Sequence, residues 1–322
     1  MSGKKIWQGV ILLFLGVVTF GYLSNIPDVF VQFQNITYWN IFILLLLRGM
    51  FLLVNGLLLK DFSSRFSVVL KPIEWIGLSF VTALGNYIAP FSGGLIARAG
   101  YLKSRHSLSI TNFAVLLSSN YLVNFFGVAI AGLAGCFSVM GSSTKLPWQL
   151  PVLFFSVAGG VLALVVLPLP VISSNNLGLR KINEALEGWK LIRNDWSLIL
   201  RLLGYTFCNI LLNSLSFYVA FRSIGVDIPY FRALLISLIA VFSLLINITP
   251  ANLGVQEAVV GLASVVLSQS TSEGLIVALI IRASTMLLVF SLGPIFAYTL
   301  SRDFNRYGDK NNKTKSKKTL KQ

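Results

Sequence analysis

The stretch GNYIAPFSGGLIARAGYLK, residues 85–103, places a proline, several glycines, an asparagine and an arginine inside an otherwise apolar run. A helix that enters this stretch loses a backbone hydrogen bond at Pro90, because proline has no N–H to donate to the carbonyl of Asn86 and its ring clashes there. The glycines that follow allow the chain to turn. The stretch therefore predicts a helix that breaks and turns back on itself.

The chain around this stretch is too apolar for an ordinary soluble domain. Of its 322 residues, 55% are hydrophobic and 11% are charged, and the mean hydropathy is +0.78. Apolar runs of about 20 residues are long enough to cross a hydrocarbon core about 30 Å thick. Such runs lie at residues 6–23, 39–59, 109–133, 151–172, 196–221 and 274–300, and two interrupted runs lie at residues 73–96 and 231–267. We therefore predict an all-α, polytopic integral membrane protein.

The positions of lysine and arginine predict which runs cross. If both interrupted runs crossed, 16 basic residues would be cytoplasmic and 8 external, whereas two hairpins that return to their own side give 21 and 3. Cytoplasmic loops are enriched in basic residues, so we predict about six crossings and two re-entrant hairpins in the cell membrane, with both termini cytoplasmic. Because the basic residues follow this topology, the net charge of +15 indicates no nucleic-acid partner.

The break occurs twice. Asn86–Arg98 and Asn247–Glu257 each have an asparagine shortly before a proline and a glycine four positions after it, and the two prolines lie 160 residues apart. With three crossings in each half, the second half is inverted relative to the first, and matching broken segments predict a transport site near the membrane midplane. We predict one transmembrane domain, residues 1–305, with repeat halves of about 1–140 and 147–305, and a disordered polybasic tail at 306–322.

Three charged side chains interrupt apolar runs: Arg48, Glu257 and Arg282. Each costs about 2.5 to 3.5 kcal/mol to insert, so we expect them to face the protein interior and to have partners. Two interpretations stay open, a buried ion pair that holds helices in register and a site that receives a charged headgroup. Two arginines against one glutamate leave a positive charge that a lipid phosphate would neutralise. Helices that restart after Pro90 and Pro250 would add N–H donors.

The predicted substrate-binding residues combine these charged side chains with residues of the two broken segments. They are Arg48, Asn86, Pro90, Gly94, Arg98, Asn120, Asn247, Pro250, Gly254, Glu257 and Arg282. Two members have a second interpretation: Arg98 as a side chain that reaches the interface, and Asn120 as hydrogen-bonding glue between helices. The two cysteines and the single histidine lack metal-ligand spacing, so we expect no metal and no cofactor.

With these residues the chain resembles the flippase-like membrane family that also forms the transmembrane half of lysylphosphatidylglycerol synthases. The first motif of that family is matched by Asn86, Pro90, Gly94 and Arg98, and the second by Thr249, Pro250, Gly254 and Glu257. The chain departs from the family at Leu95, at Gln256 and at Asn120–Asn124, where the family has charged residues. The resemblance implies that charged lipids or lipid-linked sugars are moved across the bilayer in cell-envelope pathways.

We therefore expect a flippase for an anionic phospholipid or a lipid-linked sugar intermediate, with membrane lipids as its partners. The alternative is a non-transporting membrane partner of a glycosyltransferase or of a polysaccharide assembly system, and a small-solute or ion transporter is a third candidate. We do not expect an enzyme. The eleven acidic residues include no Asp-x-Asp pair for a metal, and the single histidine lies in a basic loop, whereas hydrolysis needs a nucleophile activated by a base.

Overall fold

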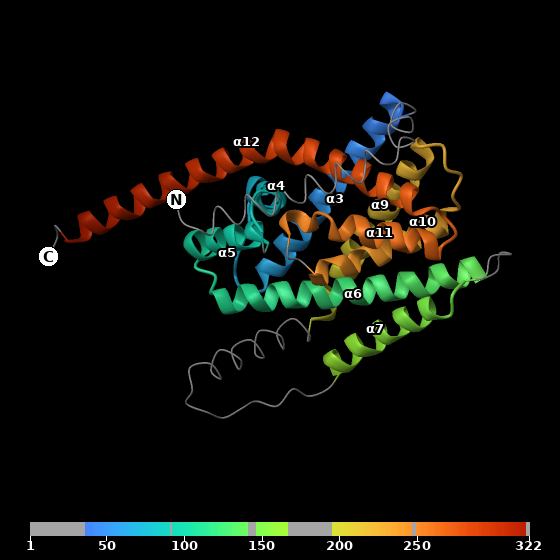
Figure 1. Ribbon diagram of the computed structural model, residues 1–322. Helices are drawn as coiled ribbons and strands as arrows, with labels where there is room; N and C mark the ends of the chain where they lie inside the picture. The colour runs from blue at the N-terminus through green and yellow to red at the C-terminus, as the bar shows by residue number, and fades with distance from the viewer. Residues whose placement is uncertain (1–35, 91, 141–145, 167–194, 247–248, 320–322) are drawn as a thin grey trace, which may run out of the picture.

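The computed structural model describes residues 36–90, 92–140, 146–166, 195–246 and 249–319, and within these ranges it contains helices and no strand (Figure 1). Among the described residues, four helices are long and apolar enough to cross a membrane: α3 (Tyr38–Ser64), α6 (Ile110–Met140), α9 (Trp196–Ser223) and the first part of α12 (Thr271–Thr319). The prediction of an all-α, polytopic membrane protein is confirmed.

In chain order, one broken hairpin lies between α3 and α6 and a second lies between α9 and α12. The first hairpin consists of α4 (Pro72–Ile88) and α5 (Gly93–His106), which pack against each other. The second consists of α10 (Tyr230–Val241), the short helices η1 (Phe242–Ile246) and η2 (Pro250–Asn252), and α11 (Val255–Val266), with α10 against α11. The four α-helices have 12 to 17 residues. They are about 18 to 26 Å long, less than the about 30 Å of a full crossing.

The first hairpin closes through a very short approach of backbone to backbone. After α4 ends, Ser92 adopts a left-handed conformation with φ of 56°, and α5 begins at the next residue. A Cβ atom at Gly94 would collide with the carbonyl oxygen of Thr82, and one at Gly85 would lie 2.6 Å from the Cα of Gly94. The side chain of Asn86 accepts a hydrogen bond from the Gly94 N–H at 3.0 Å. Glycine at these two positions is therefore a condition of the fold.

The second hairpin turns through left-handed residues. Ala251, Asn252 and Gly254 all have positive φ. The buried side chain of Asn252 donates a hydrogen bond of 2.6 Å to the carbonyl oxygen of Ser243, which ties the turn back to η1. The N–H of Gly254 donates to Glu257 Oε2 at 2.8 Å, so Glu257 caps the helix that it starts. Polar side chains thus form hydrogen bonds with backbone groups of the turn, which lipid could not provide.

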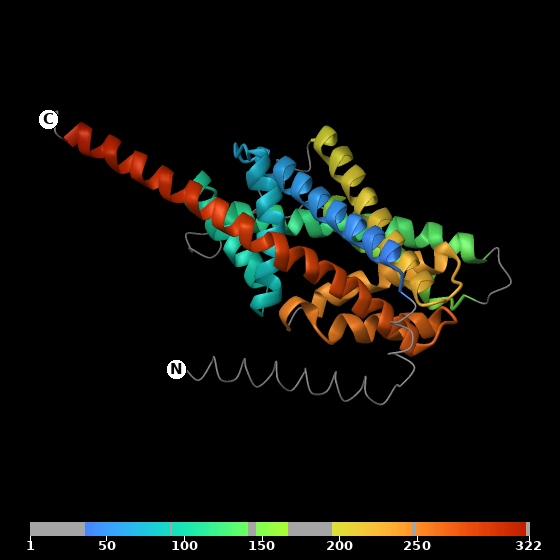
Figure 2. The ribbon, with the colours of Figure 1, turned by 90° about the horizontal axis from the view of Figure 1, so that it is seen from above.

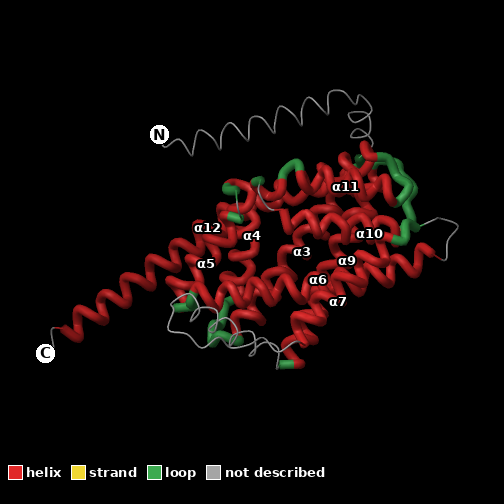
Figure 3. Tube along the Cα trace, turned by 60° about the horizontal axis from the view of Figure 1, so that its bottom comes forward, coloured by secondary structure: helices red, strands yellow, loops and turns green. Residues whose placement is uncertain are grey.

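The two hairpins contact each other, and both pack on α12. η2, at the tip of the second hairpin, contacts α4 of the first, and both α4 and α11 pack on α12. Figure 2 shows α12, in red, running past both hairpins, and Figure 3 shows the helices packed side by side with short loops between them. In addition, α3 packs on α9, and α6 packs on α7 (Gln149–Val166). The tips of the two broken segments therefore meet inside one bundle.

Some predictions fall partly or wholly outside the described residues. The predicted crossing at residues 6–23 and the site residue Asn247 lie outside them. The predicted crossing at 151–172 is described only up to Val166, as α7, which is shorter than the four long helices. α12 continues to Thr319 and so includes most of the tail. The domain limits and the sides to which the hairpins open stay predictions.

Candidate functional site

The buried ion pair of the second hairpin joins α11 to α12. Arg282 Nε donates to Glu257 Oε1, and both side chains are buried. The remaining guanidinium nitrogens of Arg282 donate to the carbonyl oxygens of Ala251 at 3.1 Å and Asn252 at 3.3 Å. Because Glu257 also caps Gly254, every one of these contacts holds the turn of the hairpin. The geometry favours the first interpretation of this pair, a structural link between helices.

Arg48 on α3 has a different environment. Its Nε donates to Thr285 Oγ1 at 2.9 Å, one terminal nitrogen donates to Asn213 Oδ1 at 2.9 Å, and the guanidinium lies 4.6 Å from the ring centroid of Phe51. These partners are neutral. Among the residues that the structure describes, no carboxylate forms an ion pair with Arg48. A half-buried guanidinium therefore lacks a protein counter-charge in the described part of the chain.

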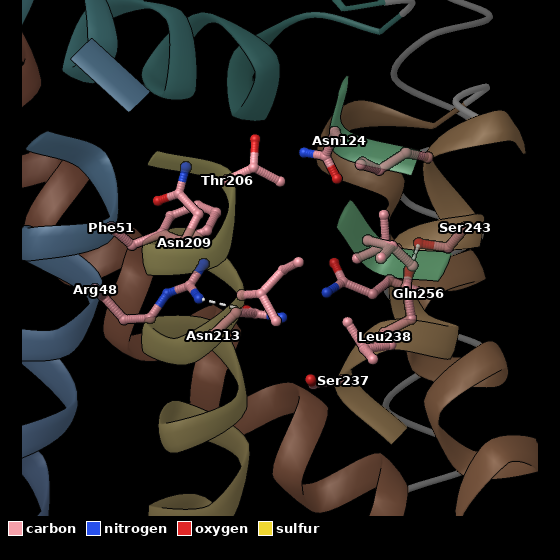
Figure 4. Close-up of a pocket in the computed structure, with 15 residues that line it drawn as sticks. Arg48, Phe51, Asn124, Thr206, Asn209, Asn213, Ser237, Leu238, Ser243 and Gln256 are labelled. Atoms are coloured by element: carbon pink, nitrogen blue, oxygen red, sulfur yellow. Dashed lines mark hydrogen bonds between the residues drawn. The ribbon is translucent and has the colours of Figure 1, made fainter. Parts of the chain in front are cut away.

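Arg48 lines a cavity of about 220 Å³ between α3, α6, α9, α10, η1 and α11. We call it the amide pocket, because its polar lining is dominated by carboxamides. That polar lining consists of Arg48, Asn124, Thr206, Asn209, Asn213, Ser237, Ser243 and Gln256. Figure 4 shows Asn124 and Gln256 across the pocket from Arg48 and Asn213. No aspartate or glutamate is among the described lining residues.

Asn209 gives the amide pocket unused hydrogen-bonding capacity. Its side chain is only 5% exposed, and its amide oxygen has no hydrogen-bond partner in the described structure. A buried polar atom without a partner costs about 1 to 3 kcal/mol, so native proteins rarely leave one unless water or a ligand completes it. The described pocket lining thus combines a cation without a carboxylate and an amide whose buried oxygen has no hydrogen-bond partner.

Arg98 lies in the first hairpin rather than in the amide pocket. Its Nε donates to Thr82 Oγ1 at 2.8 Å, which links α5 to α4. Arg98 also interacts electrostatically with Tyr121 on α6. Asn120 is half-buried on α6 and does not line the pocket, whereas Asn124, one turn further along, does. Arg98 therefore links the two arms of the first hairpin, and α6 runs from the neighbourhood of Arg98 to the pocket.

The open ends of the first hairpin are fastened by Glu74. Its carboxylate accepts hydrogen bonds from the Tyr101 hydroxyl at 2.9 Å and the Lys71 N–H at 2.9 Å, and it lies 3.1 Å from His106 Nε2. Burial alone would raise the pKa of Glu74, but the hydrogen bonds from His106, Lys71 and Tyr101 outweigh it and lower the pKa to about 2. The charged carboxylate holds the start of α4 against the end of α5.

The structure separates the predicted site into three places. Arg48 lines the amide pocket. Asn86, Pro90, Gly94 and Arg98 lie in the first hairpin, whereas Pro250, Gly254 and Glu257 lie in the second, to which Arg282 binds from α12. The predicted set did not contain the pocket residues Asn124, Thr206, Asn209, Asn213, Ser237, Ser243 and Gln256. A signal was present on α9, where Thr206, Asn209 and Asn213 follow helical spacing in an apolar helix and so share one face.

The long apolar helices, the paired breaks and the buried polar pocket define a multi-pass membrane protein with an internal site. The chain belongs to the lysylphosphatidylglycerol synthase TM region family, whose sequence model matches residues 6–293. The predicted relation to the transmembrane part of these synthases is therefore confirmed. Comparison with curated proteins and with solved structures gives no match.

Proposed function

We propose that this protein translocates an anionic lipid, either a phospholipid or a lipid-linked sugar intermediate, across the cell membrane, with both termini in the cytoplasm. The observation that carries the proposal is Arg48, a half-buried guanidinium in a pocket whose described lining contains no carboxylate. A lone charge inside the membrane is costly, and proteins retain such a charge where it serves a site. A lipid phosphate would supply the missing negative charge through paired hydrogen bonds.

The surrounding architecture supports transport rather than simple lipid storage. Two broken hairpins occupy corresponding places between long helices, and η2 of the second contacts α4 of the first. Discontinuous helices in matching halves are the usual surroundings of a transporter site, and rocking of one half against the other exposes that site to each side in turn. The amide pocket lies beside the second break, since Ser243 and Gln256 on either side of that break line it.

A flip assay in proteoliposomes tests the proposal. Fluorescent phosphatidylglycerol is placed in both leaflets, a membrane-impermeant reductant quenches the outer leaflet, and the rate of further quenching measures translocation. Arg48→Ala should slow translocation about 10- to 100-fold, because a hydrogen bond to a charged group contributes about 1.5 to 3 kcal/mol. Arg222→Ala is the matched control, since Arg222 is an exposed arginine that pairs with Asp227, and neither residue lines the pocket.

Equal rates in the wild type and in a correctly folded Arg48→Ala variant would refute the role of the pocket. If the wild-type protein moved no lipid above the rate of empty vesicles, the transport proposal itself would fail. The alternative, a non-transporting membrane partner of a glycosyltransferase or polysaccharide assembly system, would then be the better hypothesis.

A further inference from the structure

The charge of the amide pocket restricts the headgroup that it can receive. Its described lining holds one cation, Arg48, and no acidic side chain. A phosphate placed beside Arg48 is neutralised, whereas an amino cation carried on the same headgroup would enter a pocket that already contains a positive charge and offers it no carboxylate. The pocket therefore accepts one negative charge and disfavours an additional ammonium group.

The neutral groups of the pocket indicate what accompanies the phosphate. Four carboxamides, those of Asn124, Asn209, Asn213 and Gln256, line it together with three hydroxyl side chains. A carboxamide offers both a donor and an acceptor, and a hydroxyl group on a ligand is likewise both, so the two are matched partners. This lining suits a polyol or a sugar.

The size and the edge of the pocket limit the ligand further. Its volume of about 220 Å³ lies below the range of about 300 to 1,000 Å³ that is typical of pockets for drug-sized ligands. A glycerol phosphate or one sugar phosphate is of suitable size, and a long oligosaccharide or an acyl chain is not. Leu244 lines the pocket and is 45% exposed, and the side chain of its neighbour Leu245 is exposed as well. The acyl chains can therefore stay outside the pocket at this apolar edge.

We infer that the amide pocket selects lipids whose headgroup carries one phosphate and an uncharged, hydroxyl-rich group the size of glycerol or a single sugar, and that it rejects aminoacylated headgroups. This inference rests on the proposed function, because it names the substrate class of the same site. Arg48 binds the phosphate, and the carboxamides of Asn209, Asn213 and Gln256 read the hydroxyl groups.

The test is a binding experiment, so that it can be judged separately from transport. Lipid binding to the full-length protein in detergent is measured by competition with three lipids: phosphatidylglycerol, phosphatidic acid and lysylphosphatidylglycerol. We expect phosphatidylglycerol to bind about tenfold more tightly than each of the other two. Equal binding of lysylphosphatidylglycerol would overturn the charge selection, and equal binding of phosphatidic acid would overturn the reading of hydroxyl groups.

A single substitution should reverse the preference. Gln256→Glu adds a carboxylate to the pocket, so binding of phosphatidylglycerol should weaken and binding of lysylphosphatidylglycerol should strengthen. Gln269→Glu makes the same change just beyond α11 and outside the pocket lining, and it should leave both affinities unchanged. An unaltered preference in Gln256→Glu, with a melting temperature close to that of the wild type, would contradict the inference.

The outcomes also separate this inference from the proposed function. If the wild type binds the three lipids in the expected order but moves none of them in vesicles, the site is a lipid-binding site and the transport proposal fails. If the wild type translocates phosphatidylglycerol and lysylphosphatidylglycerol at equal rates and binds them equally, transport stands and the selection inferred here fails.

Discussion

The guanidinium of Arg282 on α12 donates to the carboxylate of Glu257 on α11, and the same guanidinium binds two carbonyl oxygens of the turn that precedes α11. One arginine thus connects a crossing helix, the broken turn and the helix that restarts after it. Within the described part of the chain, the hydrogen bonds of Arg48 go to neutral side chains. Substitutions of these two arginines should therefore have different effects.

Substitution of Glu257 should destabilise the protein strongly. Glu257→Gln leaves Arg282 buried without its counter-charge, and breaking a buried pair from one side costs about 3 to 5 kcal/mol. Thermal unfolding of the purified protein should show a clear loss of stability, and Glu257→Gln together with Arg282→Gln should cost less than the sum of the two single changes. Strict additivity in this cycle would contradict the pairing.

The first hairpin should not tolerate a methyl group at its closest approach. Gly94→Ala places a Cβ atom against the carbonyl oxygen of Thr82, a backbone group that cannot move aside. We expect aggregation or a loss of monodisperse protein in size-exclusion chromatography, because overpacking of this kind costs about 1 to 3 kcal/mol or more. Gly100→Ala is the matched control on the same helix, since nothing lies within 4 Å of a Cβ there. Normal behaviour of Gly94→Ala would show that the backbone contact is dispensable.

Protonation of Glu74 should loosen the base of the first hairpin only in strong acid. Its pKa is lowered from 4.5 to about 2, so its stabilising contribution is complete above about pH 4.5 and is lost as the pH falls toward 2. The melting temperature of the wild type should therefore exceed that of Glu74→Gln by a constant amount near neutral pH, and the difference should shrink in that acid window. A difference that grew on acidification would have the wrong sign.

Tyr101→Phe offers a finer version of this test. It removes one of the hydrogen bonds that lower the pKa of Glu74, so the acid-induced loss of stability should begin at a higher pH than in the wild type. The direct loss of stability near neutral pH should be small, about 1 kcal/mol, because one hydrogen bond is removed. An unchanged acid profile would show that the Tyr101 hydroxyl does not stabilise the charged carboxylate.

The two hairpins should open on opposite sides of the membrane. Single cysteines at Lys71 and Ser104 mark the ends of the first hairpin, and cysteines at Asp227 and Ser268 mark the second. In intact cells an impermeant maleimide should label the second pair and not the first, and permeabilised cells should show both. The background carries Cys136→Ala and Cys208→Ala. Labelling of the two ends of one hairpin from different sides would contradict re-entry.

The breaks could be predicted from the sequence because their causes are local. Pro90 and Pro250 each remove a backbone hydrogen-bond donor, and the glycines that follow them permit a turn. Residue Ile88 ends α4 two positions before Pro90, as the restriction on residues that precede proline leads one to expect. The resemblance to a family of membrane domains rested on the same few positions, and the match of the family over residues 6–293 confirms it.

The partners of the charges could not be predicted in the same way, because they depend on which helices become neighbours. From the sequence, either Arg48 or Arg282 could be the ion-pair partner of Glu257. Because α11 packs on α12, the partner in the structure is Arg282. Arg48 finds Asn213 and Thr285 across 165 and 237 residues of chain. The amide pocket was missed for a related reason: its polar residues come from five α-helices and η1, and only those on α9 form a pattern within one segment.

The position of α12 has a mechanical consequence. α4 and α11, one arm from each hairpin, both rest on this single helix. If α12 tilts, α4 and α11 are expected to move with it, because both pack on this helix. The two hairpins would then move together rather than independently.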